Sequence, residues 1–224
     1  MVSDGEAGEG GSGVGTLVEP VEISGMRGYL HRPVGDAIGG LVLTHGAGSD
    51  CNAELLVAAA RELARLGWMV LRCNLAYRQQ RPTGPPRSSD ARRNRDGLRL
   101  ALQSVRADYR GSVYLGGHSY GGRQASILAA EEAGVADALL LLSYPLHPPR
   151  KPEQLRTEHW PELRTPVFFV HGDRDSFGRV EEMREWVERI PARRHLEVME
   201  GAAHDLKAGR DLGFCERFVA FCGK

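Results

Sequence analysis

The chain has 224 residues, with 29 basic and 29 acidic side chains, and its formal net charge is zero. This even balance excludes bulk electrostatic capture of nucleic acid or of an anionic membrane, since both require an excess of basic side chains. No apolar run approaches the ~20 residues that span a bilayer, and the first residues have neither the basic nor the apolar region of a secretory signal. We therefore expect a soluble, cytoplasmic protein of one domain, with no membrane span and no nucleic-acid partner.

The cysteines indicate a reducing compartment. Their spacing matches neither a zinc ribbon nor a thioredoxin motif. Cys215 and Cys222 lie two turns apart on an expected helix, roughly 10 Å by helix rise, which is too far for a disulfide. We expect all four thiols to be reduced: Cys51, Cys73, Cys215 and Cys222.

The chain opens with a segment that differs from the rest. Residues 1–15 are rich in glycine and carry three acidic side chains, a composition that predicts a disordered tail. Residues 16–224 form one expected domain. Its first strands are predicted at 17–23 and 28–31, paired antiparallel at one edge of a sheet.

After this pair, short apolar strands alternate with stretches of helical period. Further strands are expected at 40–44, 68–73, 112–116, 138–143, 166–171 and 195–199. Helices are expected from an N-cap at Asn52 to a stop at Gly67, and then at 92–107, 121–133, 180–190 and 212–222. Strands that are buried on both faces and separated by single helices imply a mostly parallel sheet with right-handed crossovers. The predicted fold class is therefore α/β, a three-layer α/β/α sandwich.

The sharpest chemical signal is Gly-His-Ser-Tyr-Gly at residues 117–121, between an expected strand and an expected helix. In a nucleophile elbow of this pattern the serine lies on a strained turn, and the flanking glycines leave room for close packing around it. The helix that follows directs backbone N–H groups and the positive end of its dipole toward the reacting centre. We predict that Ser119 is a nucleophile; the alternative is a glycine-rich turn that happens to contain a serine.

A serine nucleophile needs a base, and the base needs an orienting carboxylate. His204 lies in a loop between the last strand and the last helix, and Asp175 lies just past the carboxyl end of another strand. Together with Ser119 they occupy the carboxyl edge of the sheet, where ligands bind in open α/β folds. Asp173 is the competing acid, although an aspartate in such a turn ordinarily caps its own backbone. Asp205 is expected to face solvent or to cap a helix.

An oxyanion hole is the third requirement. One donor is the backbone N–H that follows the nucleophile, that of Tyr120, and the other comes from a loop after an early strand. His-Gly-Ala-Gly at residues 45–48 occupies that place, and its small residues let the backbone approach a tetrahedral oxygen. We predict the N–H of Ala47 as the second donor; the alternative is a tight turn that only reverses the chain.

With these residues the sequence resembles the α/β-hydrolase superfamily, and more narrowly the testis-expressed-protein-like predicted hydrolases, which are related to the dienelactone hydrolases. The resemblance also rests on residues 74–78 (Asn-Leu-Ala-Tyr-Arg), 172–178 (Gly-Asp-Arg-Asp-Ser-Phe-Gly) and 201–207. It covers nearly the whole chain after residue 16 and implies a serine hydrolase with the triad named above. It implies no lactone specificity, because dienelactone hydrolases proper use a cysteine where this chain has Ser119.

Two long connections border the expected site. The first is residues 74–91, and the segment 77–95 that begins within it is rich in arginine. Our hypothesis is that Arg78 and Arg81 pair with a carboxylate or phosphate of a substrate or partner. The alternative is a solvated basic loop. Residues 144–165 stand where many relatives insert a cap domain, and their shortness predicts an open site without a large lid.

We therefore predict a serine hydrolase that cleaves an ester or related acyl bond of a small-molecule substrate, with no metal and no organic cofactor. The rival prediction is a hydrolase-fold module that binds a protein or a small ligand with little turnover, since fold does not fix function. An acyltransferase or a peptidase with the same triad is a second rival.

Overall fold

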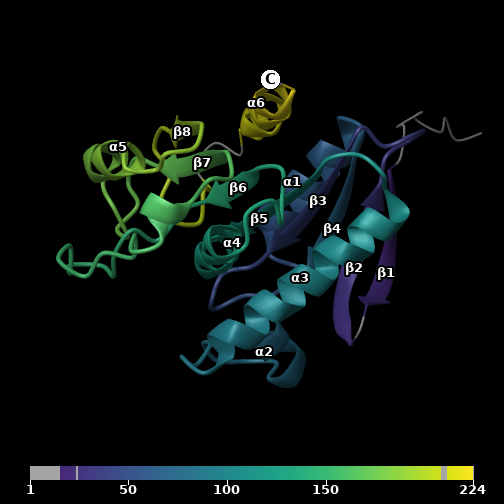
Figure 1. Ribbon diagram of the computed structural model, residues 1–224, viewed down its shortest axis with the longest axis horizontal. Coiled ribbons are helices and arrows are strands. Elements are labelled where there is room, and N and C mark those ends of the chain that lie inside the picture. The colour runs from purple at the N-terminus through teal and green to yellow at the C-terminus, as the bar shows by residue number, and fades with distance from the viewer. Residues whose placement is uncertain (1–15, 24, 208–210, 224) are drawn as a thin grey trace, which may run out of the picture.

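The structure is organised around one open sheet of eight strands (Figure 1). It is a computed structural model that describes residues 16–23, 25–207 and 211–223. The tail predicted at residues 1–15 lies outside these ranges. The strands are β1 Leu17–Ile23, β2 Met26–Arg32, β3 Gly39–Thr44, β4 Trp68–Cys73, β5 Val113–His118, β6 Leu139–Leu142, β7 Val167–Gly172 and β8 Arg194–Met199.

The sheet has an antiparallel edge and a parallel body. Its strand order is β1-β2-β4-β3-β5-β6-β7-β8. β1 pairs with β2, and β2 with β4, in antiparallel fashion, whereas all pairings from β4 to β8 are parallel. The predicted antiparallel edge pair and mostly parallel sheet are thus confirmed. The chain reverses direction across the sheet at β3, and such a switch point leaves a crevice outside the carboxyl ends of the strands.

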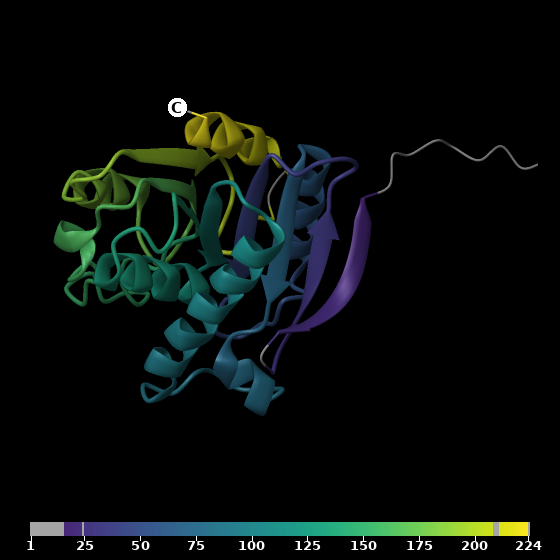
Figure 2. The same cartoon turned by 45° about the vertical axis from the view of Figure 1, so that its right-hand side comes forward.

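Helices cover both faces of the sheet and give the protein three layers (Figure 2). Side chains of α3, α4 and α5 join one buried cluster, and side chains of α1 and α6 join the other. The helices are α1 Glu54–Arg65, α2 Ala76–Gln80, α3 Asp90–Asp108, α4 Tyr120–Glu131, α5 Val180–Val187 and α6 Gly213–Cys222, and a 3₁₀ turn, η1, spans Trp160–Glu162. The predicted α/β/α architecture is confirmed.

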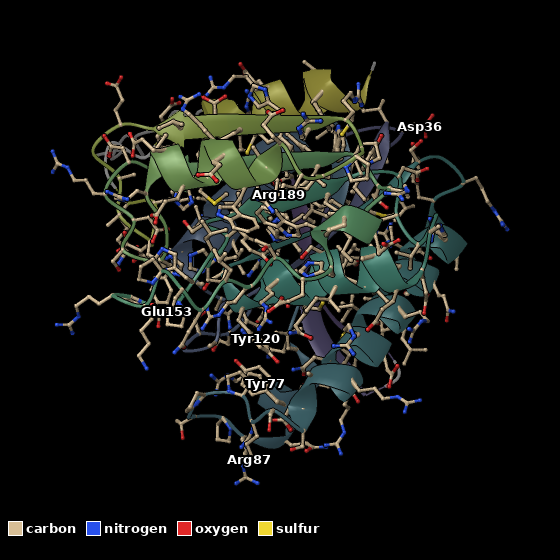
Figure 3. The ribbon with its side chains drawn as sticks, turned by 60° about the vertical axis from the view of Figure 1, so that its left-hand side comes forward. Asp36, Tyr77, Arg87, Tyr120, Glu153 and Arg189 are labelled. Atoms are coloured by element: carbon tan, nitrogen blue, oxygen red, sulfur yellow. The ribbon has the colours of Figure 1, made fainter. Side chains whose placement is uncertain are left out.

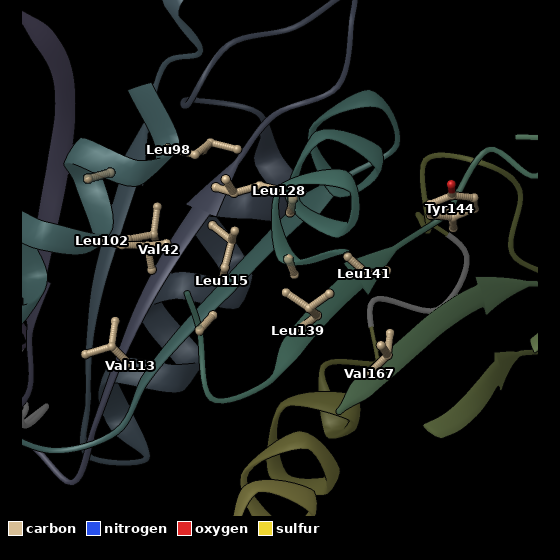
Figure 4. Close-up of a cluster of buried hydrophobic side chains, with 14 of the residues drawn as sticks. Val42, Leu98, Leu102, Val113, Leu115, Leu128, Leu139, Leu141, Tyr144 and Val167 are labelled. Carbon is tan, nitrogen blue, oxygen red and sulfur yellow. The ribbon is translucent and has the colours of Figure 1, made fainter. Parts of the chain in front are cut away.

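The larger buried cluster lies between the sheet and the helices α3 and α4 (Figure 4). Val42 on β3 and Leu115 on β5 belong to it together with Leu102 of α3 and Leu128 of α4, and all four are at most 1% exposed. Full burial of such a side chain contributes about 1.5–3 kcal/mol relative to exposure. The packed core holds the central strands in register and so fixes where their carboxyl ends lie.

The start of α1 differs from the prediction. Asn52 is not the N-cap: the helix begins at Glu54, and Ala53 occupies the cap position. The physical reason is a turn just before the helix, in which the Asn52 N–H donates to Asp50 Oδ1 (2.7 Å). The aspartate closes this turn through its own side chain, as such residues commonly do.

The predicted connection at 74–91 contains helical structure. It holds α2, whose five residues are too few for a helical period to show in the sequence. It also holds the start of α3 at Asp90, whose carboxylate accepts from the N–H of Arg87 (2.7 Å). Further along the chain, α5 ends at Val187, three residues before the predicted end.

No cap domain covers the carboxyl edge of the sheet in the described part of the chain. Between β6 and β7 the chain forms only the three-residue turn η1, in agreement with the predicted absence of a large lid. None of the helices in the described ranges combines the length and the apolar composition that a bilayer crossing requires.

Candidate active site

Ser119 lies on a sharp turn between β5 and α4. Its φ of 50° and ψ of −115° are strained for a residue with a Cβ and cost about 1–3 kcal/mol. The Ser119 N–H donates to the Leu142 carbonyl at the end of β6 (2.8 Å). This bond carries the pairing of β5 with β6 into the turn and fixes the serine at the carboxyl end of β5, in the geometry of a nucleophile elbow.

The elbow has room for this turn because two of its positions are glycine. A Cβ on Gly117 would lie 2.7 Å from the carbonyl carbon of Gly121, and a Cβ on Gly121 would lie 2.5 Å from the carbonyl oxygen of His45. Both distances are too short for a real contact. The second one shows that the elbow packs directly against residues 45–49, the segment after β3, which we call loop 45–49.

Three side chains from separate strand ends meet at the elbow. His204 Nε2 lies 2.8 Å from Ser119 Oγ, and His204 Nδ1 lies 2.8 Å from Asp175 Oδ2. Because a carboxylate only accepts, Nδ1 carries the proton and Nε2 is left to accept from the serine hydroxyl. The Asp175 side chain is fully buried, whereas 23% of the His204 side chain is exposed. The structure thus brings together the three residues that the sequence selects.

The carboxylate that contacts His204 is Asp175 and not Asp173. Asp175 Oδ1 also accepts from the backbone N–H of Phe177 (2.8 Å), so both of its oxygens have donors. Asp173 is exposed. Asp205 is exposed as well, which is one of the two alternatives expected for it, and it accepts from the backbone N–H of Lys207. It caps no helix, since α6 begins only at Gly213.

Two aromatic rings enclose the contact between Asp175 and His204. Phe177 stacks on His204, with ring centroids 4.1 Å apart and an interplanar angle of 29°. His171, at the end of β7, donates from Nε2 to the Gly178 carbonyl (2.8 Å), and its Nδ1 lies 3.8 Å from Asp175 Oδ2. Burial lowers the pKa of His171 below its ordinary value, so this ring is neutral at neutral pH. Phe177 therefore restricts rotation of His204, and His171 adds no positive charge beside the acid.

His118 ties the elbow to the loop that carries His204. Its Nε2 donates to the carbonyl oxygen of His204 (2.8 Å), and the two rings lie 5.3 Å apart. Burial lowers the pKa of His118 to about 4, so His118 is also neutral at neutral pH. It holds the His204 backbone in place without placing a second charge beside the imidazole.

Two backbone N–H groups near Ser119 have no acceptor within the described part of the chain. Tyr120 is the first residue of α4, so its N–H has no partner within the helix. Among the backbone hydrogen bonds of the described residues, none uses the N–H of Tyr120 or of Ala47 as donor. Ala47 is half-buried in loop 45–49, which touches the elbow. The two predicted oxyanion donors are therefore free and lie on neighbouring segments.

The imidazole of His45 holds the first part of loop 45–49. Its Nδ1 donates to the Gly46 carbonyl (2.8 Å), and its Nε2 accepts from the Leu75 N–H (3.1 Å). Burial lowers the pKa of His45 to about 4. The neutral ring thus uses both nitrogens, one as donor and one as acceptor, and links the loop to the chain that follows β4.

Tyr77 of α2 joins loop 45–49 to the elbow. Its hydroxyl donates to the Ala47 carbonyl (2.7 Å), and its ring packs edge-on against that of Tyr120, with centroids 6.2 Å apart (Figure 3). Asn94 of α3 contacts both tyrosines: its Oδ1 accepts from the Tyr77 N–H (3.1 Å), and its Nδ2 donates to the Tyr120 hydroxyl (3.0 Å). The N-terminal end of α3 therefore keeps α2 and the elbow at a fixed separation.

The structure requires a correction for Arg78 and Arg81, which we expected to contact a substrate anion. The Arg78 guanidinium donates to four backbone carbonyls, those of Ala47, Ser49, Arg81 and Gly84. Arg81 pairs with Asp90 at 2.5 Å. Arg78 is occupied within the protein because residues 76–80 fold as α2 against loop 45–49, and Arg81 is occupied by Asp90 at the start of α3. Between the two helices, residues 82–85 and 87–89 are exposed, as the alternative of a solvated loop predicts.

Several residues that support the site were given no such role from the sequence, among them His45, Tyr77 and Phe177. His45 directly precedes the loop glycines and Phe177 follows the acid by two residues, so proximity to a selected residue could have indicated both. Tyr77 is 30 residues from Ala47 and lies in a helix that is too short to predict. No local pattern could have indicated its contact.

The cysteines offer no rival nucleophile. All four are free, as the sequence predicts, and burial raises the pKa of each thiol. Because the thiolate is the reactive form, these thiols are inert at neutral pH. Within the described ranges, no group of three or more His, Cys, Asp and Glu side chains is arranged to hold a metal ion.

The sheet is open and mostly parallel, and a serine elbow follows β5, an acid follows β7 and a histidine follows β8. Hydrolases with a serine elbow carry their three catalytic residues in this chain order. A family model for the alpha/beta hydrolase domain matches residues 38–217. The chain therefore belongs to the α/β-hydrolase family, and this membership places it among the hydrolases of that fold.

Solved structures with the same fold cover nearly the whole chain. A dienelactone hydrolase from Anabaena variabilis is 19% identical with a TM-score of 0.74, over 92% of this chain and 96% of that one. Est1E from Butyrivibrio proteoclasticus is 17% identical with a TM-score of 0.72, over 92% and 98%. XC6422 from Xanthomonas campestris, an α/β serine hydrolase without a lid, is 19% identical with a TM-score of 0.69, over 92% and 94%. At these identities the likeness establishes the shared fold.

Proposed function

We propose that the protein is a serine hydrolase that cleaves an ester or a related acyl bond through an acyl-enzyme on Ser119. The observation that carries the proposal is the double contact of His204, 2.8 Å from Ser119 Oγ and 2.8 Å from Asp175 Oδ2. Serine catalysis requires a base within hydrogen-bond reach of the hydroxyl and an acid that orients the base. The family match and the serine hydrolases of the same fold support the proposal.

In the proposed reaction, the Ser119 hydroxyl gives its proton to His204 Nε2 while the oxygen attacks the acyl carbon. The N–H groups of Ala47 and Tyr120 stabilise the tetrahedral oxyanion, and loss of one such donor typically lowers the rate by about 10²–10³. The imidazolium then protonates the leaving group, and the acyl group remains on the serine. Water then gives a proton to the same imidazole and attacks the acyl carbon. The bond from that carbon to Ser119 Oγ breaks, the imidazolium returns the proton to Oγ, and the acid is released.

The proposed substrate is a small molecule with an acyl bond that is accessible from solvent. The short chain between β6 and β7, with η1 as its only regular element, supports access for varied acyl groups. A structure of Est1E contains bound ferulic acid, a carboxylic acid of the kind that ester cleavage releases. The four free cysteines support a cytoplasmic location, because a reducing compartment keeps thiols free.

A fluorophosphonate probe tests the proposal, because it reacts covalently with activated serines. We expect the folded wild-type protein to be labelled and the Ser119→Ala variant to be unlabelled. Ser176→Ala is the matched control, since Ser176 is an exposed serine next to the acid, and it should be labelled like the wild type. Failure to label well-folded wild-type protein would overturn the proposal in favour of a binding module.

Product analysis separates hydrolysis from acyl transfer and peptide cleavage. We expect p-nitrophenyl esters of graded chain length to yield the free acid, with or without added alcohol or amine acceptors. Acyl groups recovered on the acceptor at the expense of the acid would make the protein an acyltransferase, and faster cleavage of matched amides would make it a peptidase.

A further inference from the structure

The helix α2 directs two buried side chains at loop 45–49. Arg78 is only 6% exposed and Tyr77 is fully buried. Within the described residues, no carboxylate lies within 4 Å of the Arg78 guanidinium, in contrast to its neighbour Arg81, which pairs with Asp90. A buried cation without a counter-ion is unfavourable unless hydrogen bonds compensate its charge, and here the compensation comes from backbone carbonyls.

On one side the guanidinium holds loop 45–49. Arg78 Nη2 donates to the Ala47 carbonyl (3.2 Å), and Arg78 Nε donates to the Ser49 carbonyl (3.0 Å). The Tyr77 hydroxyl donates to the same Ala47 carbonyl (2.7 Å). The carbonyl oxygen of Ala47 therefore has two donors from α2, and both of its lone pairs are used.

On the other side the guanidinium is itself fixed. Arg78 Nη1 donates to the Arg81 carbonyl (3.2 Å), and Nη2 also donates to the Gly84 carbonyl (3.1 Å). The guanidinium lies over the Tyr77 ring, 5.0 Å from its centroid. A planar fork with five N–H donors can bridge two segments in this way, whereas the single ammonium of lysine cannot.

These contacts determine the direction of the Ala47 N–H. That N–H belongs to the peptide group whose carbonyl is Gly46, and His45 holds this carbonyl (2.8 Å). The next peptide group begins with the Ala47 carbonyl, which Arg78 and Tyr77 hold. With both flanking peptide planes fixed, the backbone of Ala47 has one orientation, although glycine stands on either side of it and would otherwise leave the loop free to move.

We infer that Arg78 is a positioning residue, which acts through loop 45–49 to aim the Ala47 N–H at the developing oxyanion, with Tyr77 as its partner. The inference rests on the proposed function, since it concerns the same reaction. Arg78 thus supports the backbone of loop 45–49 and does not bind the substrate.

A cavity makes the inference testable by chemical rescue. Arg78 lines an open cavity of about 510 Å³, together with Arg27 and Asp50. A guanidinium ion in solution can therefore reach the space that a shortened side chain leaves. Arg27 is the matched control: it lines the same cavity and bonds to Gln79 of α2, but within the described residues its side chain makes no hydrogen bond or ion pair to loop 45–49.

The experiment measures kcat and KM for a p-nitrophenyl ester with the variants Arg78→Lys, Arg78→Ala and Arg27→Ala. We expect both Arg78 variants to lower kcat about 10–100-fold, up to the loss of one oxyanion donor, and to change KM less than threefold. Guanidinium chloride at non-denaturing concentration should restore part of the kcat of Arg78→Ala. It should leave the kcat of Arg78→Lys, Arg27→Ala and the wild type unchanged.

Three results would overturn the inference. The first is a kcat for Arg78→Lys equal to that of the wild type, and the second is an equal loss in Arg27→Ala. The third is a folded Arg78→Ala whose kcat is low but does not respond to guanidinium. Should Arg78→Ala fail to fold, Arg78→Lys and Tyr77→Phe decide the matter, because each must lower kcat at constant KM.

Amide hydrogen exchange separates this inference from the proposed function. If the wild type cleaves no ester, the proposed function fails, and exchange alone tests the role of Arg78. We then expect peptides that cover loop 45–49 to exchange at least several-fold faster in Arg78→Lys than in Arg27→Ala or the wild type. Equal exchange in all three proteins would overturn the inference.

Discussion

The two sides of the proposed site are held in place by different means. Ser119, Asp175 and His204 lie on short turns after β5, β7 and β8, and the pairing of parallel strands determines where those strands end. Loop 45–49 also follows a strand, but side chains of α2 fix its carbonyls. On the triad side, we therefore expect the catalytic rate to depend mainly on the reacting side chains themselves. On the loop side, we expect it to depend mainly on the side chains that hold the backbone of loop 45–49.

The largest effect is expected on the triad side, for Asp175→Asn. The asparagine NH₂ group would face His204 Nδ1 and force the ring proton onto Nε2, which then cannot accept from Ser119. We expect kcat to fall about 10⁴-fold with little change in stability, as for the same substitution in other triads. Asp173→Asn is the control, because that side chain is exposed. Equal losses in the two variants, measured by steady-state ester hydrolysis, would contradict the assignment of the acid.

Acidic pH should lower the free energy of unfolding, because loop 45–49 and the triad side of the site each contain a buried neutral histidine. Burial lowers the pKa of His45 and of His118 to about 4 from 6.5. Between these values the unfolded chain binds a proton that the folded chain does not, so stability falls as the pH drops from 6.5 to 4. Each histidine contributes about 1.4 kcal/mol per pH unit in this window.

Urea unfolding at several pH values between 7 and 4 measures this dependence. We expect the free energy of unfolding of the His118→Asn variant to fall less steeply with decreasing pH than that of the wild type. The same slope in both proteins would show that His118 does not carry the effect.

A smaller effect is expected at His45, where support of the loop is lost but no reacting group is removed. His45→Leu deletes the bond from Nδ1 to the Gly46 carbonyl, and we expect kcat to fall about 10-fold, since the loop donor is displaced and not deleted. His45→Asn offers an amide N–H near the former Nδ1 and should recover most of the activity. Equal activity of the Leu and Asn variants would show that the hydrogen bond does not support the loop.

The smallest effect is expected for Phe177→Leu. The variant keeps the backbone N–H that donates to Asp175 and removes only the ring stacked on His204. An aromatic stack contributes about 0.5–1.5 kcal/mol beyond its buried area, so kcat should fall roughly 3–10-fold. Phe177→Tyr retains the ring and should match the wild type. A loss in Phe177→Tyr as large as in Phe177→Leu would argue against stacking as the cause.

The fold and the triad could be read from the sequence because local patterns encode them. The apolar strands are continuous runs such as Leu139–Leu142, since both faces of the sheet are covered. Ser119 stands within a glycine pattern that its strained turn requires. His204 and Asp175 follow strand ends, and the chain order alone assigns them to the same edge.

The supporting contacts could not be read from the sequence because they join distant segments. Tyr77 and Arg78 lie about 30 residues from the loop that they hold, on a helix of five residues without a visible period. An arginine-rich segment looks basic and solvated from its composition. Only the packing of α2 against loop 45–49 shows that Arg78 is buried and bonded to carbonyl oxygens.

Acid-quenched mass spectrometry tests the covalent step on Ser119 most directly. The wild-type protein is mixed with p-nitrophenyl acetate, quenched within milliseconds and digested. We predict the gain of one acetyl group, on the peptide that contains Ser119, and no such gain in Ser119→Ala. Release of p-nitrophenol without an acetylated protein, or an acetyl group on any other residue, would contradict the proposed mechanism.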